Sequence, residues 1–192
     1  MTDLLVPGRL PAGVTKEGDG ILMGHGPVRV DAFIDFLCPF CQRFELAAGP
    51  TLARLAAEGH ISLVYHPMNF LDEASTTNYS TRAAAASGCA ADGGRFIEYA
   101  NALFVSQPPE GGPGLSDAEL AEIGRAVGLA GPAFAACLAD APYRDWPPYV
   151  TARATARGVQ ATPTVVVAGT AVTPEPSSIA DAVAAAERGG AG

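Results

Sequence analysis

The chain has 192 residues, of which 48% are hydrophobic and 17% charged, and its net charge is -8 at pH 7. This length is sufficient for a sizeable core in one soluble globular domain, with room for an insertion large enough to resemble a second. The acidic balance argues against nucleic acid or an anionic membrane surface as the main partner, because both are bound through clustered Lys and Arg. No stretch approaches the roughly 20 apolar residues of a membrane-spanning helix.

Residues 1–20 are rich in Gly and Pro, which predicts an extended lead-in with turns, and we expect little of the chemistry there. The apolar run at residues 21–24 (ILMG) indicates a short edge strand, and the Gly- and Pro-containing residues 24–27 (GHGP) indicate the turn that follows it. Apolar residues then stand at every second position from Val28 to Phe36. This alternation predicts a strand with one fully apolar face.

From Cys38 to Glu58 the apolar residues recur at steps of three and four, as in an amphipathic helix. Gly49-Pro50 should kink or restart this helix, because proline cannot donate a backbone hydrogen bond, and Gly59 should cap its end. Residues 60–66 predict a second strand. Strand, helix and strand in this order form a βαβ unit, in which the strands are parallel and the crossover is right-handed.

Residues 72–158 carry no strand signals and predict four or five helices. The first two correspond to an Ala-rich stretch at residues 76–91 and an aromatic helical pattern at residues 95–105. A capping box at Ser116 starts another helix, and Pro132 occupies the first position of the next.

After residue 158 the strand pattern returns at residues 162–168, followed by a tight turn and a strand at residues 171–173. The final helix is expected at residues 179–188, capped by Ser177 or Ser178. The order βαβ, helical block, ββα predicts an α/β fold, in which a small mixed sheet has helices on both faces.

We therefore expect three parts in the chain. Residues 1–20 form an extended N-terminal segment. Residues 21–71 and 159–192 form the sheet domain, and residues 72–158 form a helical domain inserted between its βαβ and ββα portions.

The junction between the first long strand and its helix reads Cys38-Pro39-Phe40-Cys41. Two cysteines at this spacing can close a small disulfide or supply half of a metal site. A metal would need two further ligands, and the chain has no second CxxC and no HxxxH among its histidines, which are His25, His60 and His66. We therefore expect neither a metal nor another cofactor.

With Cys38 at the N-cap of the helix, its sulfur lies where free backbone N–H groups and the positive end of the helix dipole favour a thiolate. Pro39 then takes the first helical position, where no amide donor is missed. Cys41 follows one turn later, partly buried beneath Cys38. This arrangement predicts thiol-disulfide exchange, with Cys38 as the accessible nucleophile and Cys41 as the resolving thiol.

Thr162-Pro163, far away in sequence, is the expected opposite wall of this site. A proline directly before a strand suggests a cis peptide bond packed against the cysteine pair. The backbone of Thr162 would then be available to an extended substrate segment by strand addition. A trans proline that only starts the strand is the alternative.

Residues 28–45 (VRVDAFIDFLCPFCQRFE), the helical insertion and residues 161–167 (ATPTVVV) resemble the DsbA-like branch of the thioredoxin superfamily, over nearly the whole chain from about residue 20. The resemblance implies a thioredoxin-like fold with an inserted helical domain, and oxidoreductase activity on the cysteines of other proteins. For an oxidising role it also implies a membrane reoxidase of the DsbB or VKOR type. The matching positions are Cys38, Pro39, Cys41, Phe44, Glu45, Thr162 and Pro163.

The sequence departs from that branch at two positions. Many relatives carry histidine where Phe40 stands, and that histidine stabilises the reduced thiolate, so we expect a less oxidising pair here. Relatives also often carry an acid six positions before the first cysteine, proposed to assist proton transfer, and that position is Ala32. Asp35 and Asp31 are candidates for tuning the cysteines or for structural roles, and Glu45 fits the pattern after the motif.

Cys89 and Cys137 both lie in the helical block beside alanines. Two buried free cysteines are one interpretation, since cysteine packs as a small hydrophobe. The other is a structural disulfide between two insertion helices, which resembles some actinobacterial members of the family.

The four cysteines are an even number, which favours an oxidising compartment. Residues 1–20 lack the basic start and apolar middle of a signal peptide. We expect an extracytoplasmic location, in the cell envelope or secreted, with a leader or anchor absent from this chain; a cytoplasmic location stays open.

The predicted function is that of a protein thiol-disulfide oxidoreductase, a dithiol oxidase that introduces disulfides into cysteine-containing proteins through Cys38 and Cys41. A disulfide isomerase or reductase of the same fold stays open, because direction depends on the reduction potential and the recycling partner. The rival from another class is a non-catalytic peptide-binding or chaperone-like module. His66 is expected at the surface, and residues 146–149 are expected to pack between domains rather than to dock a partner.

Overall fold

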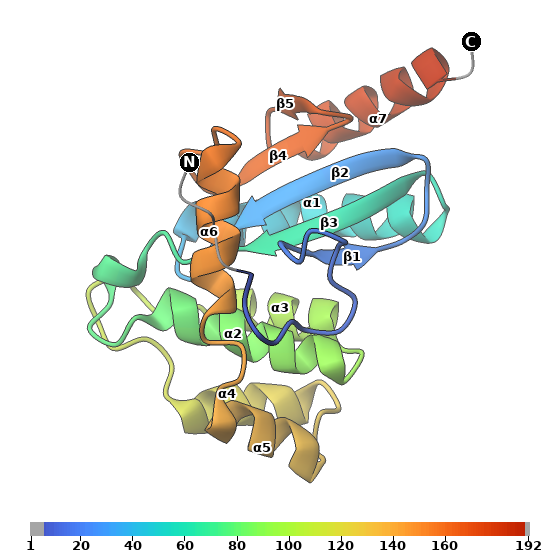
Figure 1. Cartoon of the computed structure of the whole chain (residues 1–192). Helices are drawn as coiled ribbons and strands as arrows, with labels where there is room; N and C mark the ends of the chain where they lie inside the picture. Colours follow the sequence, from blue (N-terminus) through green and yellow to red (C-terminus); the bar gives the residue numbers. More distant parts are fainter. Residues whose placement is uncertain (1–5, 191–192) are drawn as a thin grey trace.

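The computed structural model describes residues 6–190, and its centre is a five-stranded sheet in the order β1-β3-β2-β4-β5 (Figure 1). β2 and β3 are parallel, and the other neighbouring pairs are antiparallel. The predicted βαβ unit and mixed sheet are thereby confirmed. The strands are β1 (Ile21–Met23), β2 (Val28–Ile34), β3 (Ile61–Pro67), β4 (Thr164–Val167) and β5 (Thr170–Val172).

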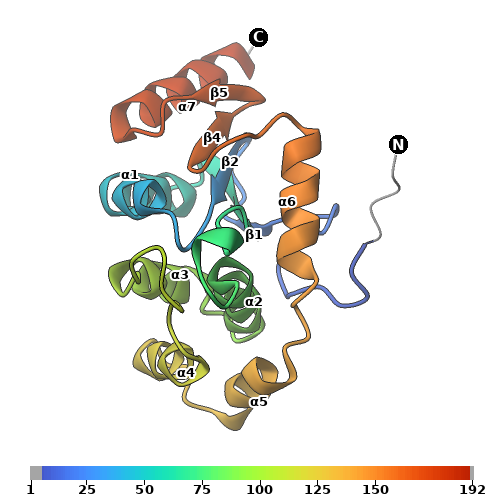
Figure 2. The same cartoon turned by 90° about the vertical axis from the view of Figure 1, so that its left-hand side faces the viewer.

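Helices cover both faces of this sheet. α1 (Pro39–Ala57) and α7 (Pro176–Gly190) lie on one side, and α6 (Trp146–Ala156) lies on the other (Figure 2). As a result β2 is buried on both faces, and Asp31 and Phe33 are only 8% and 2% exposed. The sequence predicted one fully apolar face because residue alternation within β2 cannot reveal that α6 returns to cover the other.

Five helices separate β3 from β4 within the described residues, after a short 3-10 helix, η1 (Asp72–Ala74). α2 and α3 lie next to the sheet and α1, while α4 and α5 lie farthest from it (Figure 2). α6 packs on both β3 and α2, so it joins the helical block to the sheet. The four helices before α6 are α2 (Tyr79–Asp92), α3 (Phe96–Val105), α4 (Asp117–Ala126) and α5 (Pro132–Asp140).

Local signals set most helix ends as predicted. Ser116 and Glu119 form a reciprocal capping box at the start of α4, and Pro132 is the first residue of α5. Gly59 follows α1 with a positive φ of 79°, which glycine adopts without strain. Within residues 6–190, no helix combines the length and apolarity needed to cross a membrane.

One expected helix start was wrong, and one of two alternatives for α1 is excluded, while the alternative of a kink at Pro50 stays a prediction. α1 does not restart at Pro50, because its buried face, including Ala48 and Leu52, holds the helix on the core across the missing hydrogen bond. α7 begins at Pro176 rather than at Ile179, since proline is tolerated in the first turn, where backbone amides lack helical partners.

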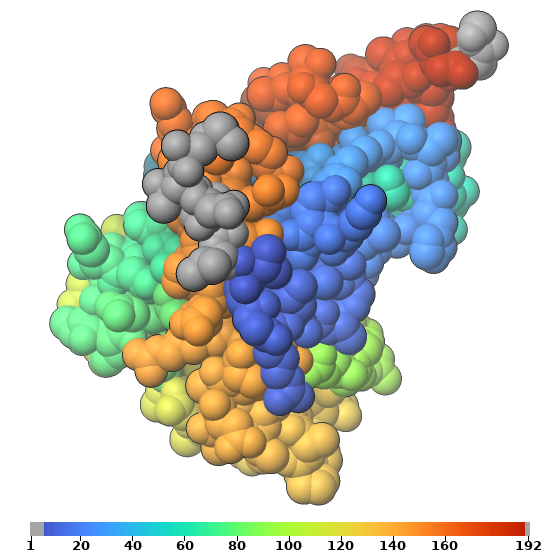
Figure 3. All heavy atoms as spheres, in the orientation of Figure 1, coloured from blue at the N-terminus to red at the C-terminus, as the bar shows by residue number. Residues whose placement is uncertain are grey.

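Of the N-terminal segment the structure describes residues 6–20, which pack onto the rest of the protein, and Figure 3 shows them lying beside α6. Trp146 Nε1 donates to the carbonyl oxygen of Gly18 at 2.8 Å, and the Tyr149 hydroxyl donates to that of Glu17 at 2.7 Å. The Trp146 side chain is fully buried, so residues 146–149 pack against other parts of the protein, as expected.

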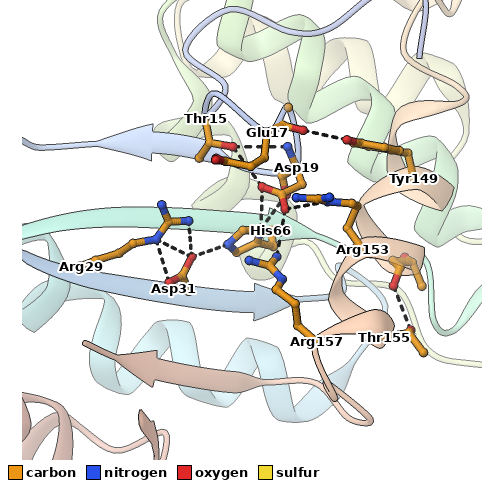
Figure 4. Close-up of polar contacts among 12 residues, drawn as sticks. Thr15, Glu17, Asp19, Arg29, Asp31, His66, Tyr149, Arg153, Thr155 and Arg157 are labelled. Atoms are coloured by element: carbon orange, nitrogen blue, oxygen red, sulfur yellow. Dashed lines mark hydrogen bonds and ion pairs between the residues drawn. The ribbon is translucent and has the colours of Figure 1, made fainter. Parts of the chain in front are cut away.

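His66 is fully buried at the end of β3, which contradicts its predicted surface position (Figure 4). Its Nδ1 lies 2.5 Å from the carbonyl oxygen of Asp19, and its Nε2 lies 2.7 Å from Oδ1 of Asp31. Burial opposes ionisation of Asp31, but hydrogen bonds from His66 and Arg29 outweigh it and lower the Asp31 pKa to about 2.

The carboxylate of Asp19 forms ion pairs with Arg153 of α6 and with Arg157, the residue that directly follows α6 (Figure 4). Together with the His66 contacts, these pairs connect the N-terminal segment, β2, β3 and α6. Buried charges are tolerated when each has a partner, so this cluster fixes how α6 lies on the sheet.

Cys89 of α2 and Cys137 of α5 form a disulfide with an S–S distance of 2.06 Å. The structure therefore favours the second of the two interpretations, in which the bond connects two helices of the insertion. Cys38 and Cys41 are free.

Replacing both Cys89 and Cys137 with Ala should lower the free energy of unfolding by about 3 to 4 kcal/mol, because the bond spans 48 residues and restricts the unfolded chain. Chemical denaturation in a Cys38→Ser, Cys41→Ser background measures this without interference from the other pair. Under reducing conditions the parent and the variant should unfold at closely similar denaturant concentrations. Equal stability under oxidising conditions would contradict the assignment of a stabilising role to this disulfide.

Candidate active site

Cys38 occupies the N-cap position of α1, with an extended backbone (φ -72°, ψ 117°), and Pro39 is the first helical residue. The chain turns sharply before it, where the Cys38 N–H donates to the carbonyl oxygen of Asp35 at 3.0 Å. Cys38 is 4% exposed and Cys41 is fully buried. Both are more buried than expected, because Thr162 and the end of α3 approach this turn from other parts of the chain.

The opposite wall comes from the segment that enters β4. The peptide bond between Thr162 and Pro163 is cis. The Cys38 thiol lies 3.3 Å from the carbonyl oxygen of Thr162 and donates to it when protonated. The antiparallel pairing of β4 with β2 brings these residues, 124 positions apart, to the same end of the sheet.

The two cysteines differ in acidity. A hydrogen bond from the Cys41 thiol is the largest cause that lowers the Cys38 pKa, and the Thr162 side chain and the N–H groups of Phe40 and Cys41 add to it. Burial opposes these contacts, and the net Cys38 pKa is about 6. Burial and the nearby Cys38 charge raise the Cys41 pKa well above its ordinary value. Near neutral pH the reduced pair therefore holds one thiolate, on Cys38, and one proton, on Cys41.

Asp35 lies inside this site and is fully buried. Its N–H donates to Cys41 Sγ at 3.4 Å, and its carboxylate accepts hydrogen bonds from the Leu37 N–H, the Leu71 N–H and the Ser80 hydroxyl. Burial raises the Asp35 pKa to about 6, and the Cys38 charge contributes to the rise. The sequence left a turn role and a tuning role open, and these contacts suit both.

Sequence reasoning missed Gln107, which follows α3. Its side-chain nitrogen donates to the carbonyl oxygens of Phe36 and Cys38, at 2.9 and 3.0 Å. In the other direction, Gln42 Nε2 of α1 donates to the carbonyl oxygen of Phe104 at 2.7 Å. No local signal marks either glutamine, since both partners are backbone atoms brought close only by the fold. These bonds fix the active-site turn against the helical insertion.

Of the remaining predicted tuning residues, Asp31 lies on β2, where its recorded side-chain contacts are with Arg29 and His66, and Phe40 and Glu45 lie on α1. Phe40 is 60% exposed, and the guanidinium carbon of Arg43 lies 4.4 Å from the centre of its ring. Glu45 is buried, and its recorded side-chain hydrogen bond is to the Tyr65 hydroxyl, at 3.1 Å, rather than to a cysteine. Ala32 is buried in β2 and offers no titratable group. Within residues 6–190, no group of three or more His, Cys, Asp or Glu residues could hold a metal ion.

Comparisons with known proteins agree with this geometry. Residues 16–185 match the thioredoxin family. DsbA from Mycobacterium tuberculosis, in its oxidised form, is 33% identical, and the alignment covers 88% of this chain and 100% of that one, with a TM-score of 0.70. DsbG from the same organism, a disulfide bond oxidoreductase in its reduced form, is 35% identical over 81% of this chain and 80% of that one, with a TM-score of 0.69.

MdbA from Actinomyces oris, a thiol-disulfide oxidoreductase, shares the fold at 20% identity, with a TM-score of 0.75 and coverage of 92% of each chain. An alignment 119 residues long, which covers 57% of this chain, is 37% identical to the serine/threonine-protein kinase PknE of M. tuberculosis. The chain spans only 21% of the length of that kinase. The kinase name therefore describes the whole relative and not the part that this chain resembles.

The fold, the free cysteine pair and these similarities define a thiol-disulfide oxidoreductase with a DsbA-like fold. The chain belongs to the thioredoxin family.

In the reduced protein, Cys38 should titrate with a midpoint near pH 6, and Cys41→Ala should raise that midpoint, because it removes the hydrogen bond that lowers the pKa most. Thiolate absorbance at 240 nm between pH 4 and pH 9 measures both. Cys38→Ser is the control and should lose this transition. A midpoint that stays the same in Cys41→Ala would refute the assigned cause.

Proposed function

We propose that this protein is a dithiol oxidase that introduces disulfides into cysteine-containing proteins outside the cytoplasm. The observation that carries the proposal is the difference in acidity within the pair, in which the Cys38 pKa is lowered to about 6 while that of Cys41 is raised. A stabilised thiolate on Cys38 favours the reduced pair, so the oxidised pair readily passes its disulfide to another protein. The Cys89–Cys137 disulfide supports the location, since such bonds persist in oxidising compartments.

The reaction begins with the pair joined as a Cys38–Cys41 disulfide. A substrate thiolate attacks the sulfur of Cys38, a mixed disulfide forms, and Cys41 leaves as a thiolate that takes up a proton. A second substrate thiolate then attacks the substrate sulfur of the mixed disulfide. The substrate disulfide forms, and Cys38 leaves as a stabilised thiolate. Two electrons have passed from the substrate to the pair.

Asp35 and Thr162 are the residues placed to assist these steps. Asp35 is buried beside the pair, and its pKa of about 6 permits it to hold or release a proton while Cys41 changes state. When ionised it also opposes the Cys38 charge, which limits how strongly the thiolate is stabilised. The backbone of Thr162, at the entry to β4, suits an extended substrate segment approaching Cys38.

Each cycle leaves the pair reduced, so a further oxidant must accept two electrons from it. A membrane reoxidase of the DsbB or VKOR type is the expected partner for this step. The Cys38 thiolate would attack the disulfide of such a partner and form a mixed disulfide, with one partner sulfur leaving as a thiolate. Cys41, after losing its proton, would then attack Cys38, which leaves the Cys38–Cys41 pair oxidised and the partner as a dithiol.

The oxidised protein, mixed in stoichiometric amount with a reduced and unfolded disulfide protein, should generate substrate disulfides and become reduced itself. Counting thiols on both partners over time measures the exchange. Cys38→Ser is the control and should be inactive. If substrate thiols are not lost here, and the protein instead rearranges the disulfides of a mispaired substrate in a parallel reaction, it is an isomerase.

A companion experiment distinguishes the binding module by mixing reduced Cys41→Ser with a substrate that carries a disulfide. The Cys38 thiolate attacks that disulfide, and one substrate sulfur leaves as a thiolate. Without its resolving thiol, the variant should accumulate mixed disulfides at Cys38, visible on non-reducing gels. Persistent substrate association without any mixed disulfide would favour a non-catalytic peptide-binding role.

Phe40→His should make the pair more oxidising, because a protonated imidazole beside Cys38 stabilises the thiolate and has no counterpart in the disulfide. We expect a fall of about one unit in the Cys38 pKa and up to about a tenfold shift of the glutathione equilibrium toward the reduced protein. Phe40→Leu is the matched control and should leave the equilibrium nearly unchanged. An equal shift in both variants would exclude the electrostatic explanation.

A further inference from the structure

A pocket of about 300 Å³ lies between α1, α3 and the β1–β3 edge of the sheet, and it takes no part in the exchange chemistry described above. A second hollow of about 300 Å³ adjoins it and shares Glu45, Gly49, Ala53 and Asn101 with it. Most of the lining is apolar. The apolar walls of the first pocket include Met23, Ala56, Leu63 and Ile97.

Glu45 is the exception in this lining. Its side chain is 6% exposed, and Oε2 accepts a hydrogen bond from the Tyr65 hydroxyl at 3.1 Å. Oε1 is buried and has no hydrogen-bond partner among the described residues. A buried polar atom without a partner costs about 1–3 kcal/mol, and more when it is charged, so this oxygen calls for a donor.

The pocket also lacks a compensating positive charge. None of the residues that line the two hollows is Lys, Arg or His. Across α1, α3, β1 and β3, the titratable groups in the lining are Glu45 and Tyr65. Burial raises the Glu45 pKa to about 7, and it raises the Tyr65 pKa well above the ordinary value, so Tyr65 stays neutral.

Space beside the carboxylate is preserved by Gly49, one turn after Glu45 on α1. A Cβ at this position would lie 3.1 Å from Glu45 Oε2. Asn101 of α3, which lines both hollows, adds an amide at their shared rim. The site thus combines apolar walls, one buried acceptor and one amide.

We propose that this pocket binds a small primary amine with an apolar body. Oε1 has almost no accessible surface in this structure, so the Glu45 side chain turns toward the pocket to accept the hydrogen bond of the ammonium group. The ligand supplies the positive charge that the lining lacks, and its apolar body packs against Met23, Leu63 and Ile97. A neutral alcohol of the same size would fill the pocket without the ion pair. Because the site involves neither cysteine, the proposal does not depend on the direction of disulfide exchange.

The two ligand classes differ in pH dependence. An ammonium ion binds the ionised carboxylate, so its affinity rises as the pH passes upward through the Glu45 pKa and falls below it. With a pKa of about 7, the ionised fraction increases about tenfold between pH 6 and pH 8. An alkylamine stays protonated over this range, since such amines titrate near pH 10.

The test titrates n-hexylamine and n-hexanol into the wild-type protein at pH 6 and pH 8, followed by calorimetry and by amide NMR shifts. n-Hexylamine should bind about tenfold more tightly at pH 8 than at pH 6 and shift the signals of Ile97 and Asn101. n-Hexanol should show no such pH dependence. Glu45→Gln should abolish the pH dependence for the amine, whereas Glu110→Gln, at an exposed glutamate, should preserve it.

Ala53 is an exposed residue that lines both hollows, and Ala53→Leu is a second variant to use if Glu45→Gln does not fold. It should weaken both ligands by obstructing the pocket, while the pH dependence of the amine remains. The proposal is overturned if amine and alcohol bind alike at pH 8, if Glu45→Gln binds the amine as tightly as the wild type, or if the NMR shifts map elsewhere.

Discussion

The interaction of the Cys41 thiol with the Cys38 thiolate is the one on which the site depends. It is the largest cause of the lowered Cys38 pKa, and it requires Cys38 at the N-cap and Cys41 one turn later on α1. That placement in turn requires β2 to end at residue 34 and the chain to turn through Asp35. The parallel β2–β3 pairing and the antiparallel β2–β4 pairing then set the turn opposite Thr162. The redox site therefore lies at one end of the sheet, where the turn between β2 and α1 meets the segment that enters β4.

Buried charges in this protein fall into two groups. Those around His66 are paired, and they fasten α6 and the N-terminal segment to the sheet. Asp35 and Glu45 have no cationic hydrogen-bond partner within the described residues, and burial raises the pKa of both. A paired buried charge mainly fixes structure, whereas a buried carboxyl group with a raised pKa can exchange a proton or receive a ligand. This difference distinguishes the structural cluster from the two functional candidates.

The direction of exchange rests on a balance of opposing effects. The Cys41 hydrogen bond and the helix N-terminus stabilise the Cys38 thiolate, while burial and the charge of Asp35 oppose it. Phe40 contributes no hydrogen bond of its own side chain, and it points its exposed ring toward Arg43. The pair therefore combines a marked difference in acidity between its two cysteines with a side chain at position 40 that cannot titrate.

The sequence alone determined most helices and strands and the reacting cysteine pair. Strand alternation, capping residues and the CxxC spacing are local signals, which can be recognised from neighbouring residues without the fold. Cys38, Cys41 and the βαβ unit could be predicted for that reason. The disulfide between Cys89 and Cys137, the burial of His66 and the contacts of Gln107 were decided by tertiary structure. Each depends on the distance between segments that lie 35 or more residues apart, and no local pattern encodes that distance. The unpartnered oxygen of Glu45 belongs with them, since only packing shows that a donor is missing.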